Sequence, residues 1–143
     1  MFIVFSCKKE KQDKLEGEKS ILIGNWYWIH TYHEYNKCEQ CCIIYDTLHQ
    51  VNSVNKYEMR FAKEGELKFY QNDELTKEYR IVFDDFYKWQ YGWGDYVFDI
   101  HLNNDPNNRL LGVVSEDSLY TWDYPYESDD QNCFTYQNFF IKQ

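Results

Sequence analysis

Residues 56–71, KYEMRFAKEGELKFYQ, decide the fold that this sequence predicts. Apolar and charged residues alternate in both halves of the stretch, which is typical of a β-strand with one buried face. The apolar positions are Tyr57, Met59, Phe61, Leu67 and Phe69. Gly65 separates the halves and tolerates positive φ, so the stretch predicts a β-hairpin.

The same period of two continues on both sides of this hairpin. Residues 25–35 predict a strand with Trp26, Trp28, His30 and Tyr32 on one face and Tyr27, Ile29, Thr31 and His33 on the other. After a turn at QNDE, residues 75–83 predict another. Further strands are expected at residues 96–102, 109–114, 117–124 and 133–142, with turn signals between them, of which NNDPNN (103–108) is the strongest.

About eight strands joined by short turns predict an all-β fold, an antiparallel up-and-down β-barrel, with a two-sheet sandwich as the alternative. Aromatic residues make up 20% of the chain, which favours strands over helices. A barrel of eight strands is either filled by side chains or holds one small ligand. The positions expected to point inward are Trp28, Met59, Phe61, Leu67, Phe69, Ile81, Phe98, Ile100 and Phe140.

The segment from Asp84 to Tyr96, DDFYKWQYGWGDY, breaks the alternation and is expected to be a loop. Two interpretations stay open: its aromatic rings cap one end of the barrel, or they form an exposed platform or lid that binds an apolar ligand or a sugar. The candidate ligand-binding residues are Phe86, Trp89, Tyr91 and Trp93 of this segment, with Trp28 and Phe98 of the barrel.

The N-terminus begins with MFIVFSC, a short apolar run that ends at a cysteine. Residues 1–6 look like the remnant of a signal peptide, and VFSC resembles the lipobox of bacterial lipoproteins, which predicts lipidation of Cys7. Residues 7–20 are mostly charged and are expected to form a flexible tether. Residues 21–143 would then be the barrel domain. The natural start is expected upstream of Met1.

Charge and hydropathy exclude several classes of protein. The chain has 24 acidic and 15 basic residues, a formal net charge of −9, and no basic stripe, so nucleic acid is not an expected partner. No stretch approaches the roughly 18 consecutive apolar residues of a membrane-spanning helix, so membrane contact is expected through the lipid alone.

Four further cysteines remain: Cys38, Cys41, Cys42 and Cys133. In an exported protein they allow three complete disulfide pairings, and we expect a bridge from the CEQCC cluster to Cys133. A zinc site made by His30, His33, Cys38 and Cys41 is the alternative. The odd spacing of the two histidines puts them on opposite faces of a strand unless a bulge intervenes, so no metal is predicted.

Other catalytic patterns are weak. No nucleophile elbow is present, and neither is a phosphate-binding glycine loop. The carboxylate pairs Asp84–Asp85 and Asp129–Asp130 are expected to be solvated, and the spacing of Asp123, Glu127, Asp129 and Asp130 fits no standard calcium loop. The sequence therefore predicts a protein that is not an enzyme and has no cofactor.

The ordered set of motifs resembles the bacterial lipocalin-like lipoproteins. The matching stretches are LIGNWYWIHTY (22–32), YEMRFAKEGELKFYQND (57–73), EDSLYTWD (116–123) and DDQNCFTYQNFFIK (129–142). The resemblance implies a monomeric lipocalin-like barrel anchored in the outer membrane, periplasmic or surface-facing. It implies binding of a small apolar ligand in the barrel, or of an envelope protein or glycan at its mouth. The alternative is an assembly lipoprotein with a solid-packed barrel.

Overall fold

The computed structural model describes residues 11–36, 43–49, 54–90, 94–122 and 134–143. A 3-10 helix, η1 (Gly17–Leu22), precedes the strands. The strands are β1 (Gly24–Asn36), β2 (Ile43–His49), β3 (Tyr57–Ala62), β4 (Glu66–Gln71), β5 (Glu74–Lys88), β6 (Tyr96–Leu102), β7 (Asp105–Val114), β8 (Ser118–Trp122) and β9 (Phe134–Lys142). All pairings are antiparallel, and β9 returns to β1. The predicted eight-stranded up-and-down barrel is confirmed.

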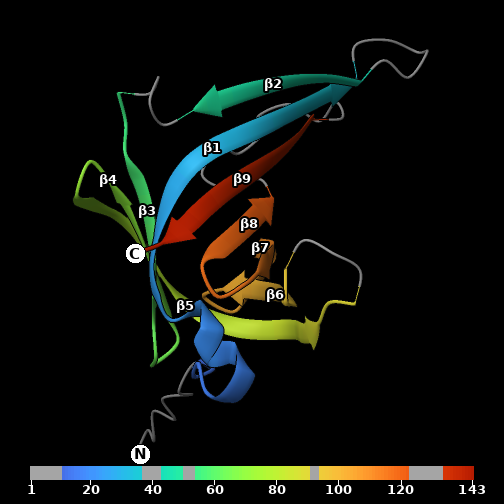
Figure 1. Ribbon diagram of the computed structural model, residues 1–143. Coiled ribbons are helices and arrows are strands. Elements are labelled where there is room, and N and C mark those ends of the chain that lie inside the picture. Colours follow the sequence, from blue (N-terminus) through green and yellow to red (C-terminus); the bar gives the residue numbers. More distant parts are fainter. Residues whose placement is uncertain (1–10, 37–42, 50–53, 91–93, 123–133) are drawn as a thin grey trace, which may run out of the picture.

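One strand, β2, was not expected from the sequence. It pairs with residues 30–36 of β1, on the same edge that β3 uses at residues 24–27. On its other edge β1 pairs with β9 over nearly its whole length. Figure 1 shows the result: β1, β2 and β9 run side by side away from the rest of the barrel, at the end opposite η1.

The barrel interior is apolar and closely filled along the part of the chain described here. All nine positions expected to point inward are buried, with exposed fractions of 2% or less. Trp26 is also fully buried and donates its indole N–H to the backbone oxygen of Leu22 over 2.8 Å. Burying a side chain of this size stabilises a fold by about 1.5–3 kcal/mol, so these residues provide most of the driving force for folding.

A β-bulge corrects the faces predicted for the first strand. The register of β1 against β9 shifts between Trp28 and His30. Because a one-residue insertion exchanges the faces of all later residues, Thr31 is buried, while the His30 ring packs 4.9 Å from the Phe139 ring outside the barrel. The prediction that Trp28 and His30 share a face was therefore wrong.

The N-terminal segment closes one end of the barrel instead of hanging free. The Asp13 N–H donates to the Ile81 carbonyl over 2.9 Å, and Leu15 is fully buried in the core. Gly65 permits this approach, because a Cβ atom there would lie 2.0 Å from the Asp13 carbonyl oxygen. The tether predicted for residues 7–20 thus differs from the structure at residues 11–20, which pack on the barrel.

Strand β5 runs further than the sequence indicated. It continues to Lys88, so residues 84–88 are strand and not loop, and its register shifts between Phe83 and Asp85. The Phe86 ring stacks on Tyr96 at 5.1 Å and meets Phe83 edge-on at 5.7 Å. Lys19 of η1 lies 4.2 Å above the Phe83 ring, so these aromatics sit under the helix that closes this end.

Two tight turns follow the predicted turn chemistry. Asn72 and Asp73 between β4 and β5, and Asn103 and Asn104 between β6 and β7, all have positive φ. Consecutive residues of this kind form the turns that match the twist of a hairpin. The second turn is shorter than the predicted 103–108, because β7 begins at Asp105.

Candidate functional site

The predicted ligand-binding residues inside the barrel, Trp28 and Phe98, are part of the packed core. Both side chains are fully buried. The Trp28 indole N–H donates to Thr31 Oγ1 over 2.8 Å, and that hydroxyl donates to Asn138 Oδ1 over 2.6 Å. Thr121, which is opposite Asn138 in the register, is buried as well. Trp28, Thr31 and Asn138 thus form a chain of hydrogen bonds, as buried polar groups in a stable core must.

The aromatic segment does not form a single platform. Phe86 faces the core, whereas Tyr87 and Trp89 are 43% and 37% exposed. Tyr91 and Trp93 lie outside the described residues. Gly94 returns against the outer wall, since a Cβ at that position would lie 2.3 Å from Val113 Cγ1. The capping interpretation therefore describes Phe86, and Tyr87 belongs to the outer surface.

The predicted lipidation, disulfide and metal residues can be placed only in part. Cys7, Cys38, Cys41, Cys42 and Cys133 lie outside the described residues, as do the carboxylates at positions 123–130. No register shift separates positions 30 and 33 of β1, so the two histidines keep opposite parity. Within the described ranges no cluster of three or more His, Cys, Asp or Glu side chains could hold a metal ion. Nor does any helix found there have the length and apolar character to cross a membrane.

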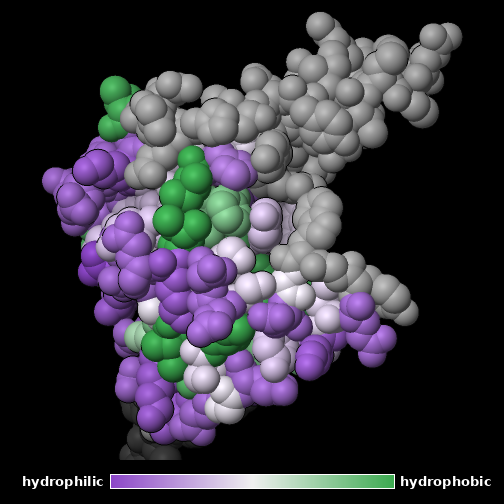
Figure 2. All heavy atoms as spheres, viewed as in Figure 1, coloured by the Kyte–Doolittle hydropathy of each residue, from purple (hydrophilic) through white to green (hydrophobic). Residues whose placement is uncertain are grey.

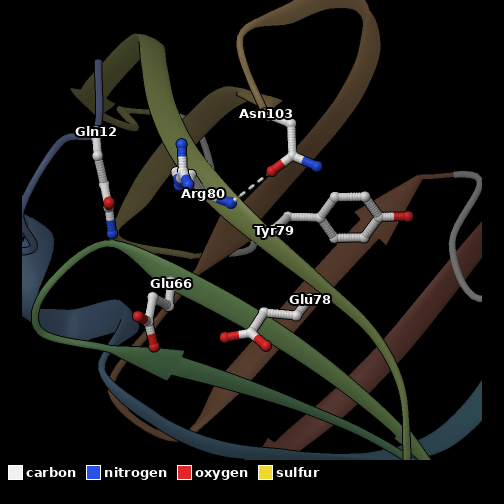
Figure 3. A pocket seen from close by; sticks show the side chains of 6 residues that line it. All are labelled: Gln12, Glu66, Glu78, Tyr79, Arg80 and Asn103. Carbon is white, nitrogen blue, oxygen red and sulfur yellow. Dashed lines mark hydrogen bonds between the residues drawn. The ribbon is translucent and has the colours of Figure 1, made fainter. Parts of the chain in front are cut away.

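An open polar pocket with a volume of about 490 Å³ lies on the outer wall, beside the N-terminal segment. It is lined by Gln12, Glu66, Glu78, Tyr79, Arg80 and Asn103. Figure 3 shows the two carboxylates pointing into the same space from neighbouring strands, while the Tyr79 ring extends to the other side of β5. Asn103 Oδ1 accepts the backbone N–H of Arg80 over 2.9 Å, which ties the turn after β6 to β5.

Charges around this pocket largely neutralise one another. Lys68 Nζ lies 3.3 Å from the carboxylates of both Glu66 and Glu78. Hydrogen bonds to Glu66 first, and then to Glu78, raise the pKa of Lys68 above its ordinary value. The pocket therefore offers amides and balanced charges, but no strong field that would select an ionic ligand.

A second polar group lies on the outer wall where β5, β6 and β7 meet. The bulge in β5 places Asp84 Oδ2 2.9 Å from His101 Nδ1 and 3.2 Å from Arg109 Nη2. The imidazole contact lacks hydrogen-bond geometry, so the pair attracts only when His101 is protonated. Arg109 also donates to both Asp99 oxygens, and this pairing raises its pKa.

Asp84 was expected to be a solvated loop carboxylate unconnected with His101, but it lies on β5 beside His101 and Arg109. The alternation of the sequence could have revealed this polar group, because Asp99, His101 and Arg109 all occupy outward positions of their strands. The imidazole and carboxylate required for acid–base chemistry thus converge, but on a convex wall and not in a cleft. A catalytic site also needs a substrate position shielded from water, which these residues do not provide.

The outer surface of the barrel has two contrasting faces. The ion-pair face is carried by β3, β4 and β5; the apolar face is carried by β5 to β9. The ion-pair face consists of Glu58, Arg60, Glu66, Lys68, Tyr70 and Glu78. The apolar face consists of Tyr87, Val97, Leu111, Val113, Tyr120 and Phe139.

Figure 2 shows one side of the molecule, on which hydrophilic side chains cover most of the described surface and hydrophobic ones form small, separate clusters. A comparison of the chain with protein-family models, curated proteins and solved structures found no match in any of the three.

Proposed function

We propose that this chain is a non-enzymatic binding protein whose solid-packed barrel serves as a scaffold for contacts with another protein. A lipid on Cys7 would hold it at the cell envelope, in the outer membrane. The observation that carries this proposal is the filled interior: sixteen apolar side chains, from Leu15 to Phe140, form one cluster and are almost completely buried. A core packed to this degree leaves its outer surface as the place for function.

The filled interior also favours one of the two roles that the sequence left open, the carriage of a small ligand and the contact with another protein. A ligand carrier needs free volume lined by side chains that the ligand can touch. Trp28 and Phe98, the barrel residues expected to touch it, are instead enclosed by other core side chains. The interaction role is therefore better supported than the carriage of an apolar molecule.

The envelope location rests on the sequence at residues 1–7. It is compatible with the closed end of the barrel, because η1 and residues 11–15 join this end to the segment that follows Cys7. An anchor attached there would lie on the side of the ion-pair face, because Gln12 lines the same pocket as Glu66 and Glu78. A protein partner in the envelope would then have freer access to the apolar face.

Native mass spectrometry tests the proposal. The full chain would be purified from its own host in a mild detergent, and its native mass compared with its denatured mass. We expect the two masses to agree, and a lipid on Cys7 to persist in both because it is covalent. An adduct of a few hundred daltons that is lost on denaturation would show a carrier and overturn the proposal.

A further inference from the structure

We infer that the apolar face binds a cationic, amphipathic segment of a partner protein. This inference rests on the proposed function and names the surface and the chemistry of the partner. The apolar face is one continuous row across neighbouring strands: Tyr87 is opposite Val97, and Val97 is opposite Val113. The row continues through Tyr120 and Phe139, whose rings lie 4.7 Å apart.

The exposed fraction of the side chains rises from the middle of the apolar face to its border, and this arrangement suits docking. Val97 and Val113 are only 8% exposed although they point outward, so the middle of the face is already packed and rigid. Tyr87 and Leu111 stand at its border with 43% of their surface exposed. A partner that covers these two side chains would extend an existing apolar layer without reordering the barrel, and preorganisation of this kind favours binding.

The charges around the apolar face select the partner. Seven carboxylates and three Lys or Arg side chains belong to the described residues of this wall from Asp84 to Lys142. The carboxylates are Asp84, Asp85, Asp95, Asp99, Asp105, Glu116 and Asp117, and the cations are Lys88, Arg109 and Lys142. Arg109 is already held by two of the carboxylates, so the excess negative charge is left to a ligand.

A positively charged partner complements this rim, since opposite potentials across an interface direct association and fix orientation. A second copy of the chain would instead place like charges against one another. The Leu111 side chain, which is 43% exposed and has no hydrogen-bonding atom, is matched by apolar side chains rather than by sugar hydroxyls. An amphipathic segment with lysine or arginine beside its apolar residues satisfies both the rim and the centre.

The test uses a synthetic 18-residue amphipathic helix of leucine and lysine, labelled with a fluorophore, and the full chain in detergent. A bound peptide would cover the exposed part of the Leu111 and Tyr87 side chains, so losing either side chain weakens binding roughly tenfold. We expect Leu111→Ser and Tyr87→Ser each to lower the affinity for this peptide about tenfold, as measured by fluorescence anisotropy. Added salt is expected to weaken the binding further.

Leu75→Ser is the matched control, because Leu75 is 51% exposed but lies at the opposite end of β5 from Tyr87, where it is paired with Tyr70 of the ion-pair face. It should leave the affinity unchanged. A peptide with glutamate in place of lysine should not bind. Equal binding to wild type, Leu111→Ser and Leu75→Ser would overturn the inference but leave the proposed function standing. A dimer that Leu111→Ser dissociates, detected by sedimentation velocity, would also overturn it, since the occupant would be a second copy.

Discussion

The ion-pair face and the apolar face enclose the same core yet differ in how their charged side chains are paired. On the ion-pair face Arg60 pairs with Glu58, and Lys68 bridges Glu66 and Glu78, so each cation has a carboxylate within the same wall. On the apolar face acidic side chains outnumber basic ones around a centre of valine and leucine. A packed barrel therefore leaves its outer surface free to differ: the charges of one face pair with one another, and the other face carries an excess of acidic charge beside exposed apolar side chains.

The largest effect on the free energy of unfolding should come from adding a methyl group beneath the apolar face. A Cβ atom at Gly112 would lie 2.4 Å from Phe98 Cζ and 2.5 Å from the Tyr120 carbonyl oxygen. Because neither a buried ring nor a backbone can easily move, Gly112→Ala should reduce the free energy of unfolding by about 3 kcal/mol, the upper part of the overpacking range. Chemical denaturation measures this value.

Gly17→Ala is the control for this substitution. Gly17 has φ of +60° but nothing within 4 Å of an added Cβ, so its cost comes from backbone strain alone and should be about 1 kcal/mol. If Gly112→Ala and Gly17→Ala reduce the free energy of unfolding equally, the rigid support attributed to the apolar face is absent. The contrast between the two faces is then lost.

The next effect concerns the one buried charge of the ion-pair face. Glu58 is only 6% exposed, and Arg60 Nε donates to its carboxylate over 2.5 Å while lying 4.0 Å above the Tyr70 ring. Arg60→Met would leave that carboxylate buried without its cation, which should destabilise the fold by about 2 kcal/mol. Thermal and denaturant unfolding measure the loss.

The second substitution Glu58→Gln decides the cause of that loss. If the unpaired charge is responsible, Glu58→Gln should recover at least half of the stability in the Arg60→Met background. No recovery would mean that Arg60 acts through its packing on Tyr70. In that case the ion-pair face would be stabilised by contact area, like the apolar face.

Period-two alternation was enough to predict the barrel and its core. Met59, Phe61, Leu67 and Phe69 alternate without interruption on two strands joined by a glycine turn, and each is buried as expected. Such positions follow from the pleat alone, because neighbouring side chains on a strand must point to opposite faces.

What the alternation missed depends on local insertions and on distant contacts. The bulges before His30 and at Asp84 each add one residue to a strand, and nothing in the neighbouring residues marks them. The docking of Leu15 depends on Lys63 and Gly65, about fifty residues away, so a charged segment looked like a tether. The apolar face was missed because it appears only when the outward positions of five strands are aligned.

A smaller, pH-dependent effect is expected at the seam between β1 and β9, the last strand of the apolar face. Lys142 Nζ donates to the Ile21 carbonyl over 2.9 Å and lies 5.0 Å above the Trp26 ring, and desolvation by burial lowers its pKa below 10.5. The unfolded chain then binds more protons than the folded one as the pH approaches 10.5, so stability should rise with pH in that window. Because Lys142 is only partly buried, solvent screening should keep the gain below about 1 kcal/mol.

Thermal melts between about pH 8 and pH 10 measure this slope, with Lys142→Met as the reference in which it should disappear. Tyr96 acts in the opposite direction at higher pH, because desolvation and its hydrogen bond to Glu18 raise its pKa above 10.0. Its stabilising contribution is present below pH 10 and is lost above it, so the chosen window separates the two groups. A slope that persists in Lys142→Met would exclude Lys142 as its source.

The smallest effect is expected where the ion-pair face has the most charges. Lys68 is about one-third exposed and reaches both of its carboxylates at 3.3 Å, which is long for a charge-assisted hydrogen bond. Exposed pairs of this kind contribute little after the loss of side-chain freedom, so Lys68→Met should change the free energy of unfolding by less than about 0.5 kcal/mol. Leu111→Ser on the apolar face should have an equally small effect on unfolding, because Leu111 is largely exposed. If the two variants are almost equally stable and only Leu111→Ser weakens peptide binding, the two faces differ in the binding of a partner and not in their contribution to stability. A loss above 1 kcal/mol in Lys68→Met would instead make the ion pairs structural, and the contrast would then be one of stability.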